Sequence, residues 1–509
     1  MADCGPRNEP ADGRNDEPAD VVSNTALALV TQVVTAGLTA VLTLYLTRKL
    51  GPRSFGEFSL AVSVVGVMLV VADGGISASS GRFLAEQRRD RQRVVTILAN
   101  ALTLKLIVAL TASVALFALA APLAHAYADP DLTWPFRAVA IVLFTQSLMA
   151  YYSNALVSVE RISANLAIYT AESIAETLAS VALVALGGGA GGAAFGRAIG
   201  YAVGAVAAIW LSARVFGRRA LVPAKPNRGV VGPIVRYAGV MFVVSGAWTL
   251  FSQVDVLLIG AYVGSAEVGL FSAPLRLCTV LHYPGLAIQN SVAPRLARGP
   301  GREPDVRSFQ VALRGLVILQ AAMLAPVLVW ASPIIDLLLG SGYARSAEVL
   351  RALAPFVFMQ GLGPVISVGV NYLGGSRRRI RIAVAAFLID LLLDVLLIPR
   401  IGALGGAIAT SVAYALYVPA HLLICRDLLG ISLRPLTITS IRALIASAGA
   451  AGVLWLTGTS SLSLSDWLLG GAGAAAAFIG LLLLSREVSP SDFRRLARAV
   501  ARLARSRTG

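Results

Sequence analysis

Long apolar runs alternate with short polar connections along almost the whole chain. A helix needs about twenty apolar residues to cross the hydrocarbon of a bilayer. Fourteen stretches reach that length, and we predict membrane spans at residues 22–46, 58–80, 94–120, 136–158, 162–186, 190–212, 234–260, 267–293, 311–335, 349–373, 380–398, 402–424, 438–457 and 466–485. The pattern therefore predicts an all-α polytopic membrane protein with fourteen transmembrane helices.

Composition supports the same class. The chain has 509 residues, of which 57% are hydrophobic and 14% charged, whereas a soluble protein carries roughly a quarter charged residues. The net charge of +16 comes from short Arg clusters between apolar runs, where lipid headgroups would lie. We expect anionic membrane lipids as partners and no nucleic acid, because the chain has no folded basic domain with a groove-reading motif.

The basic connections predict the orientation. Clusters of Arg and Lys follow the second, sixth, eighth and tenth spans, whereas the connections after the fifth, seventh and thirteenth spans have neither. By the positive-inside rule, the even-to-odd connections and both termini face the cytoplasm. Arg48, Lys49 and Arg53 are an exception on the outer side: they either face headgroups or help to bind an anionic substrate.

Two end segments differ from the rest. Residues 1–20 are polar and rich in Pro, Asp and Glu, so we expect a disordered cytoplasmic tail and no cleavable signal peptide. Within residues 487–509, Phe493, Leu496, Val500 and Leu503 recur at helical spacing among arginines, which predicts a basic amphipathic helix on the cytoplasmic leaflet. The cysteines (Cys4, Cys278 and Cys425) are too scattered to suggest a metal site or a disulfide framework.

The sequence contains an internal duplication. The segment at 51–59 (GPRSFGEFS) returns at 264–272 (GSAEVGLFS), and the glycines at 188–192 return at 402–406, shifts of 213 and 214 positions. We therefore predict two pseudo-symmetric six-helix bundles with a substrate path between them, the layout of a transporter. The predicted divisions are the tail 1–20, an N-terminal bundle 21–215, a cytoplasmic linker 216–233, a C-terminal bundle 234–430, two further helices within 431–486 and the basic helix 487–509.

These segments carry a family resemblance. Residues 50–86, 252–277, 291–298 and 397–416 resemble the corresponding helix-connection segments of polysaccharide-exporting flippases. The chain is thereby identified as a member of the multidrug/oligosaccharidyl-lipid/polysaccharide exporter superfamily, and within it resembles the Wzx-type oligosaccharide flippases. The resemblance implies a transporter of the bacterial inner membrane, without enzymatic activity, that moves a polyprenyl-diphosphate-linked oligosaccharide to the outer leaflet for surface polysaccharide synthesis. Candidate protein partners are a polysaccharide polymerase and glycosyltransferases.

Buried cations are the first candidates for a site. An ionisable residue within a span costs about 2.5–3.5 kcal/mol on insertion scales and is therefore a functional candidate. The basic ones are Lys105, Arg197 and Arg276, and the planar fork of Arg suits a diphosphate. Each could instead form an interhelical ion pair or reach a membrane boundary.

Buried acids are the second group. Glu172 and Glu176 lie four residues apart on one helical face, as do Asp390 and Asp394, and Asp255 lies in the family-like Ser-Gln-x-Asp stretch. Such carboxylates could couple transport to H⁺ or Na⁺, or pair with an Arg of the opposite half to hold one conformation. No other cofactor is expected. Pro274, Pro284 and Pro364 are candidate bending points or fixed kinks.

Three other functions compete with this prediction. A lipid II flippase and a cation-coupled multidrug exporter share the superfamily, although the exporters usually have twelve spans and handle cationic drugs. A membrane-embedded glycosyltransferase or polymerase would need a sizeable loop or soluble module, and the longest outer connection, residues 121–135, is short.

Overall fold

The computed structural model describes residues 18–296, 305–372, 376–460 and 462–489. Its ordered elements in these ranges are helices, as expected from the apolar pattern. The first half of the chain forms α1 (Pro18–Asp73), α2 (Ile76–Glu86), α3 (Arg91–Ala126), η1 (Pro130–Leu132), α4 (Thr133–Ser158), α5 (Ile162–Ala185), α6 (Gly189–Phe216) and η2 (Arg218–Leu221). Most of the predicted N-terminal tail and of the basic helix 487–509 lies outside the described residues.

The second half contains more and shorter helices. They are α7 (Arg228–Tyr262), α8 (Ser265–Val280), α9 (Tyr283–Leu296), α10 (Val306–Val329), α11 (Ala331–Leu338), η3 (Ser341–Tyr343), α12 (Ser346–Ala352), α13 (Ala354–Gln360), α14 (Gly363–Tyr372), α15 (Ser376–Ile401), α16 (Ala403–Leu429), α17 (Arg434–Thr457) and α18 (Leu464–Leu484).

Within the described ranges, eleven helices are long and apolar enough to cross a membrane. The polytopic all-α class is thus confirmed, and the count of fourteen stays a prediction with which the helices are consistent. The helix α1 contains the first predicted span and most of the second, divided at Gly51, and the end of the second span lies in α2. The eighth predicted span corresponds to α8 plus α9, and the tenth to α12, α13 and α14. The joining of the first two spans in α1, and the breaks within the eighth and tenth spans, therefore account for the difference.

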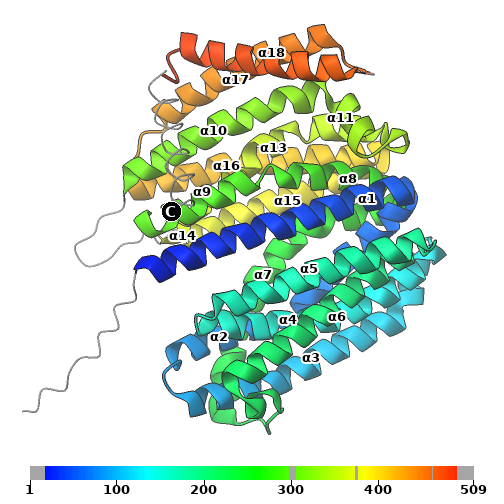
Figure 1. Cartoon of the computed structure of the whole chain (residues 1–509), viewed down its shortest axis with the longest axis vertical. Coiled ribbons are helices and arrows are strands. Elements are labelled where there is room, and N and C mark those ends of the chain that lie inside the picture. The colour runs from blue at the N-terminus through cyan, green and yellow to red at the C-terminus, as the bar shows by residue number, and fades with distance from the viewer. Residues whose placement is uncertain (1–17, 297–304, 373–375, 461, 490–509) are drawn as a thin grey trace, which may run out of the picture.

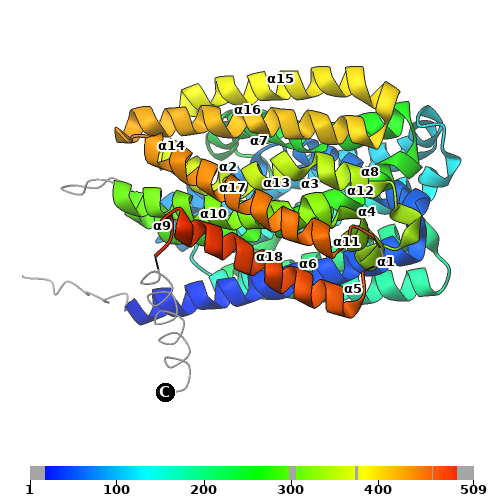
Figure 2. The same cartoon turned by 90° about the horizontal axis from the view of Figure 1, so that it is seen from above.

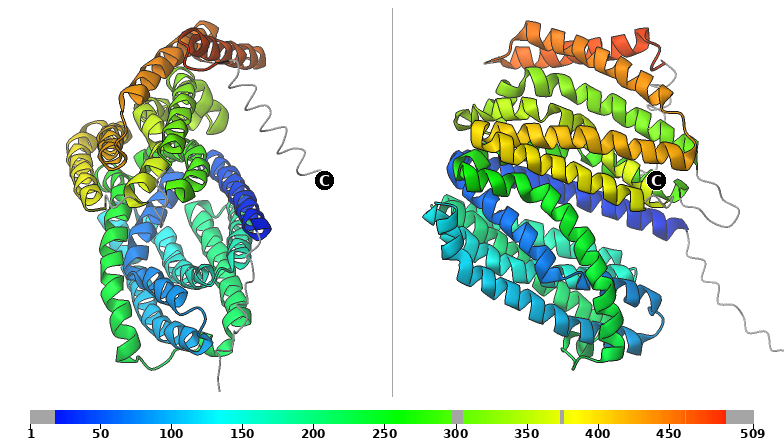
Figure 3. Two further views of the ribbon diagram at one scale, coloured as in Figure 1. Left: turned by 90° about the vertical axis from the view of Figure 1, so that its left-hand side faces the viewer. Right: turned by 180° about the vertical axis from the view of Figure 1, so that it is seen from behind.

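The helices form two bundles that stand side by side (Figure 1). We call α2–α6 with residues 52–73 of α1 the N-terminal bundle, and α8–α16 the C-terminal bundle. The first part of α1 lies between the two, and α7 starts beside the N-terminal bundle and ends in the C-terminal one (Figures 1 and 3). Figure 2 shows α1 beginning and α18 ending at the same end of the molecule. We call that end the terminus end and the opposite one the kink end.

At the kink end the duplicated segments have the same backbone. Gly51 has φ 70° and ψ 177°, and Gly264 has φ 107° and ψ 175°, values that favour glycine because it has no Cβ. Five residues after each kink, Gly56 and Gly269 lie where two helices cross. A Cβ on Gly56 would lie 1.7 Å from the carbonyl oxygen of Ser265, and one on Gly269 would lie 1.9 Å from that of Pro52. The two bundles therefore touch backbone to backbone through equivalent glycines.

Exposed apolar side chains cover the flanks of the helices. In α18, Leu464, Leu468, Leu469 and Leu484 are each between 65% and 81% exposed. Exposing four leucines of a 21-residue helix to water is unfavourable, whereas lipid acyl chains would solvate them. The flanks are therefore the faces that contact acyl chains.

The last two long helices, α17 and α18, pack on the edge of the C-terminal bundle against α10 (Figures 1 and 3). Toward the kink end, the indole nitrogen of Trp330 donates a hydrogen bond to the carbonyl of Gly458, 3.1 Å away, and the ring lies 4.8 Å from that of Trp467. Toward the terminus end, Glu487 docks the pair.

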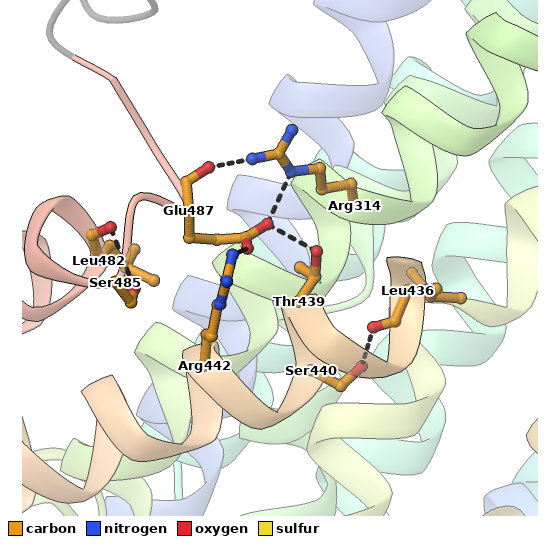
Figure 4. A network of polar contacts seen from close by, with 8 residues as sticks. All are labelled: Arg314, Leu436, Thr439, Ser440, Arg442, Leu482, Ser485 and Glu487. Carbon is orange, nitrogen blue, oxygen red and sulfur yellow. Dashed lines mark hydrogen bonds and ion pairs between the residues drawn. The ribbon is translucent and has the colours of Figure 1, made fainter. Parts of the chain in front are cut away.

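The Glu487 carboxylate joins three helices (Figure 4). It lies 2.7 Å from Nε of Arg314 on α10, accepts a hydrogen bond from Thr439 on α17 at 2.6 Å, and lies 3.0 Å from Arg442. Burial by itself would raise the pKa of Glu487, but the hydrogen bonds from Thr439 and Arg442 and the charge of Arg314 outweigh burial and lower that pKa. The carboxylate stays ionised and fixes the end of α18.

Candidate functional site

Three aspartates from two helices meet inside the C-terminal bundle. Asp255 lies on α7, and Asp390 and Asp394 lie one turn apart on α15. They are 7%, 1% and 0% exposed, and one carboxylate oxygen from each lies within 4.8 Å of the others. The hydroxyl of Thr410 on α16 donates to Asp255 at 2.7 Å. We call these three acids the aspartate triad.

The aspartate triad has no positive partner among the residues that the structure describes. Oδ1 of Asp255, Oδ1 of Asp390 and both carboxylate oxygens of Asp394 are buried without a hydrogen-bond partner. No ion pair in the described part of the chain involves any of the three. Bringing three like charges together in a dry interior costs many kcal/mol unless something neutralises them. Protons or a hard cation that prefers oxygen ligands fit this donor set.

The N-terminal bundle holds its acids differently. Glu172 and Glu176 lie on α5, and Nη1 of Arg197 on α6 is 2.6 Å from Oε1 of Glu176. Arg197 also donates to the hydroxyl of Tyr201 at 3.2 Å, and its Nε is buried without a partner. Here the protein itself supplies the counter-charge. The sequence-predicted residues Glu172, Glu176 and Arg197 are thus brought together into one group.

Glycines allow α5 and α6 to approach this closely. A Cβ at Gly196 would lie 2.4 Å from Ser180, and one at Gly200 would lie 2.5 Å from Cβ of Glu176. A Cβ at Gly204 would lie 2.9 Å from Cβ of Glu172. The spacing of these glycines is the small-xxx-small pattern of closely packed membrane helices. This pattern was not predicted, although the sequence shows it as GRAIGYAVG.

Arg276 lies on α8 where the bundles meet. Its guanidinium packs over the rings of Phe55 and Phe58, with distances of 5.4 and 5.7 Å to their centroids, and it has no hydrogen bond or ion pair to the described residues. Arg197 and Glu176 of the other bundle are near enough to act on its charge. An unpaired guanidinium in such a place favours binding of an anion.

A cavity of about 480 Å³ adjoins Arg276. It lies between α1, α8 and α10 and is lined largely by apolar groups, among them Leu44, Leu277, Met323 and Val327. Arg276 is the charged residue in its wall. The arrangement offers apolar contact for a chain next to a cation for its head.

Lys105 lies in a different environment from the two arginines. Its side chain on α3 is fully buried, its ammonium pairs with Asp73, and it lies 3.2 Å from the hydroxyl of Ser77. Asp73 ends α1 just before the glycines that separate it from α2, and a Cβ at Gly75 would lie 2.2 Å from the carbonyl oxygen of Ala238 on α7. Lys105 therefore already has its partners, at a helix break of the N-terminal bundle.

The predicted bending prolines mark two helix breaks. Pro284 and Pro364 are each the second residue of a helix, in α9 and α14, directly after a break, whereas Pro274 lies buried inside α8. The breaks touch, because a Cβ at Gly285 would lie 2.2 Å from the carbonyl oxygen of Gly361. Whether these positions bend during transport stays a prediction.

Glutamine side chains donate hydrogen bonds to backbone carbonyls at these breaks. Gln320 on α10 donates to the carbonyl of Leu281 at 2.9 Å, and Gln360 donates to that of Cys278 at 2.8 Å. Nδ1 of His282 lies 3.0 Å from the carbonyl oxygen of Gln360 and donates to it. Carbonyls freed from a helix inside a membrane protein need such partners, so both breaks are built into the fold.

The kink end is held by polar contacts as well as glycines. Asp129, between α3 and η1, accepts a hydrogen bond from Ser265 of α8 at 2.6 Å and lies 3.3 Å from Arg53. Nε of Arg48 donates at 3.1 Å to the carbonyl of Leu338, the last residue of α11. Arg48 and Arg53, which we predicted on the outer side, thus bind protein groups. Asp129 was not predicted, because its partner lies 136 residues away.

Known proteins show which family has this architecture. The model of the polysaccharide biosynthesis protein family matches residues 21–299, more than half of the chain. This chain belongs to that family. A curated relative, the probable low-salt glycan biosynthesis flippase Agl15 of Haloferax volcanii, is 21% identical over 281 residues, which is 54% of this chain and 59% of the relative. The chain thus matches less than two thirds of that relative's length.

Solved structures of transporters share the fold of this chain. The lipid II flippase MurJ in an inward closed conformation matches with a TM-score of 0.74 at 12% identity, over 90% of this chain and 98% of that one. An inward-facing multidrug resistance MATE transporter of the MOP superfamily matches with a TM-score of 0.62 at 16% identity, over 78% and 96%. The chain therefore has the fold of these transporters.

Proposed function

We propose that this protein is a flippase that moves a polyprenyl-diphosphate-linked oligosaccharide from the cytoplasmic to the outer leaflet for surface polysaccharide synthesis. The observation that carries the proposal is the unpaired Arg276, which lies between the Arg197 group of the N-terminal bundle and an apolar cavity. Two guanidiniums suit a diphosphate because each can donate paired hydrogen bonds to phosphoryl oxygens. The adjoining apolar cavity suits the start of a polyprenyl chain.

The division into bundles supports alternating access. We propose the boundaries 21–215, 216–233 and 234–430, with helices within 431–486 attached to the C-terminal bundle and both termini in the cytoplasm of a bacterium. On this orientation the glycine crossing at Gly56 and Gly269 and the Asp129–Ser265 bond close the outer side. The head group would then enter from the terminus end. Pro284 and Pro364 stand where α9 and α14 could tilt.

The aspartate triad is proposed as the coupling site. Because its carboxylates lack a cation of their own, H⁺ or Na⁺ from solution would neutralise them, and the bound cation would favour one arrangement of α7, α15 and α16. In this proposal the C-terminal bundle holds the coupling ion, while Arg276 and Arg197 hold the diphosphate.

The test is transport of a fluorescent polyprenyl-diphosphate oligosaccharide in proteoliposomes. Replacing Arg276 by Ala removes a charged hydrogen-bond donor worth about 1.5–3 kcal/mol, so we expect transport to fall roughly ten- to hundredfold with normal protein level. Arg434→Ala, at an exposed residue of α17, is the matched control and should transport normally. Unchanged transport by Arg276→Ala would remove Arg276 from the proposed site.

A lipid II flippase is the second candidate, favoured by the fold match to MurJ over 98% of that chain. The two substrates share the polyprenyl diphosphate and differ in the sugar, and lipid II also carries a peptide. Deleting the gene and identifying which lipid-linked sugar accumulates on the inner leaflet separates them. Accumulation of an oligosaccharide without peptide supports the first proposal, and accumulation of lipid II supports the second.

A further inference from the structure

The acids of the N-terminal bundle are arranged as an unequal pair. Glu172 and Glu176 lie one turn apart on α5 and are 5% and 9% exposed. Glu172 accepts a hydrogen bond from Ser173 at 3.1 Å, whereas Glu176 is the member that forms an ion pair within the described residues, with Arg197. Two carboxylates in contact repel when both are ionised, whereas one shared proton gives a hydrogen bond between them. With one proton on the pair, a single negative charge lies beside Arg197.

Few other charged or titratable groups lie near the Glu172–Glu176 pair in the described part of the chain. The helix α6 presents Arg197 and Tyr201, and α8 presents Arg276. Tyr169 of α5 itself interacts with Glu172, and α1 contributes Tyr45, whose hydroxyl donates to the carbonyl of Val181. The helix α4 contributes Met149 and Ser153, which do not titrate. The two arginines are thus the positive charges that face the pair in the described part of the chain.

The charges of the group sum to one positive unit before substrate binds, from two arginines and one shared-proton acid pair. A diphosphate diester brings one negative charge on each of its two phosphoryl groups, which leaves a net charge of minus one. A single additional proton restores neutrality. A phosphoryl oxygen that binds Arg197 also competes with Glu176 for the same donors, since the guanidinium has a limited number of N–H groups.

We propose that a diphosphate head group bound at Arg197 and Arg276 is accompanied by uptake of one proton by the Glu172–Glu176 pair. The phosphoryl oxygen replaces the Glu176 carboxylate on Arg197, and that carboxylate takes a proton from water to become a carboxylic acid. Release of the head group reverses both steps. A neutral complex costs less to enclose in a low-dielectric interior than a charged one, so the acid pair favours closure around the loaded head.

This inference rests on the proposed function, and the probe is farnesyl diphosphate esterified to N-acetylglucosamine, a diester without a group that titrates near neutral pH. Its binding to the purified full chain is measured by calorimetry at pH 7.5 in buffers of different ionisation enthalpy. We expect about one proton taken up per bound diester, and an affinity that weakens by up to about tenfold for each pH unit of increase. Glu176→Gln should bind with proton uptake near zero and an affinity independent of pH.

Two further variants keep the result decisive. Glu172→Gln should also remove the uptake, and it replaces Glu176→Gln if that variant fails to fold. Glu160→Gln, at the exposed partner of Arg88, should keep the full uptake. Binding by the wild type without proton uptake, or uptake that persists in both Glu172→Gln and Glu176→Gln, overturns the inference while the proposed function stands. No binding of the diester by the wild type overturns both.

Discussion

Glu176 in the N-terminal bundle and Asp390 in the C-terminal bundle occupy equivalent places in the two repeats, 214 positions apart, and have opposite surroundings. Glu176 pairs with Arg197 at 2.6 Å. The position equivalent to Arg197 in the C-terminal bundle is Ser411, which bonds the carbonyl of Ala352 instead. Asp390 therefore shares its site with two more acids and no fixed cation.

The difference shows that the same helical repeat can carry either a site with its own positive charge or a site made of acids alone. Where α6 has Gly196 against Ser180, α16 has Thr410, and its partner helix has Asp394 in place of the serine. In the first bundle the positive charge is part of the chain, and we propose that the site beside it binds an anion. In the second bundle we propose that the positive charge comes from solution.

The largest expected effect is on the free energy of unfolding, when the charged residues of the two sites are removed one at a time. Arg197→Ala leaves Glu176 buried and unpaired, which costs about 3–5 kcal/mol of unfolding free energy. Asp390→Asn removes one of three mutually repelling carboxylates, so stability should stay the same or rise. Thermal unfolding in detergent at pH 8 without Na⁺ measures both. A loss of stability in Asp390→Asn similar to that in Arg197→Ala would mean that the aspartate triad already has a counter-charge.

A smaller loss of stability is expected from overpacking the equivalent glycines of the two repeats at the kink end. Gly56→Ala and Gly269→Ala each place a Cβ within 2 Å of a carbonyl oxygen of the other bundle, and overpacking of this kind costs about 1–3 kcal/mol. Both should therefore shift the bundles apart at the kink end, to similar extents. Accessibility of a cysteine introduced at Ser265 to a membrane-impermeant thiol reagent measures the shift.

Gly66→Ala is the matched control for that experiment, because its Cβ would be 3.7 Å from the nearest atom, in Gln253. It should leave the labelling unchanged. Equal labelling of Gly56→Ala and Gly66→Ala would show that the crossing does not hold the kink end closed.

The smallest effect concerns Glu487, an acid with fixed cations like Glu176 but with partner arginines that are more exposed than Arg197. Arg314 and Arg442 are 50% and 40% exposed, so we expect Glu487→Gln to cost only about 1 kcal/mol. The pKa of Glu487 is lower in the folded than in the unfolded protein, where it is about 4.3. The ionised carboxylate therefore stabilises the fold at pH values above about 4.3, and this contribution is lost as the pH falls through the folded-state pKa. Proteolysis or unfolding of wild type and Glu487→Gln should therefore differ at pH 7 and converge near pH 3.

The sequence could predict the membrane class and the repeat because both depend on local patterns. Apolar runs mark spans, and a shift of 213 positions places Gly51 over Gly264, which have matching backbone angles in the structure. The breaks inside the eighth and tenth spans could not be predicted, because the partners of the freed carbonyls, Gln320 and Gln360, come from elsewhere in the chain.

The site was predictable as a set of residues but not as a set of contacts. Spacing placed Asp390 and Asp394 on one face of a helix, yet the third member, Asp255, lies 135 positions before Asp390 in the sequence. Lys105 looked like a cavity cation, and only the folded chain shows that Asp73 holds it. Partners that depend on tertiary packing carry no local signal.

The central claim, that the C-terminal bundle takes its cation from solution to drive movement of a diphosphate lipid, is tested most directly by gradient-driven transport. Proteoliposomes containing wild type or Asp255→Asn are loaded with a fluorescent polyprenyl-diphosphate oligosaccharide and subjected to an imposed Na⁺ or H⁺ gradient. We predict that the gradient of the coupling ion accelerates transport by the wild type, and that transport by Asp255→Asn stays low with either gradient. Equal wild-type rates with and without both gradients would contradict the account.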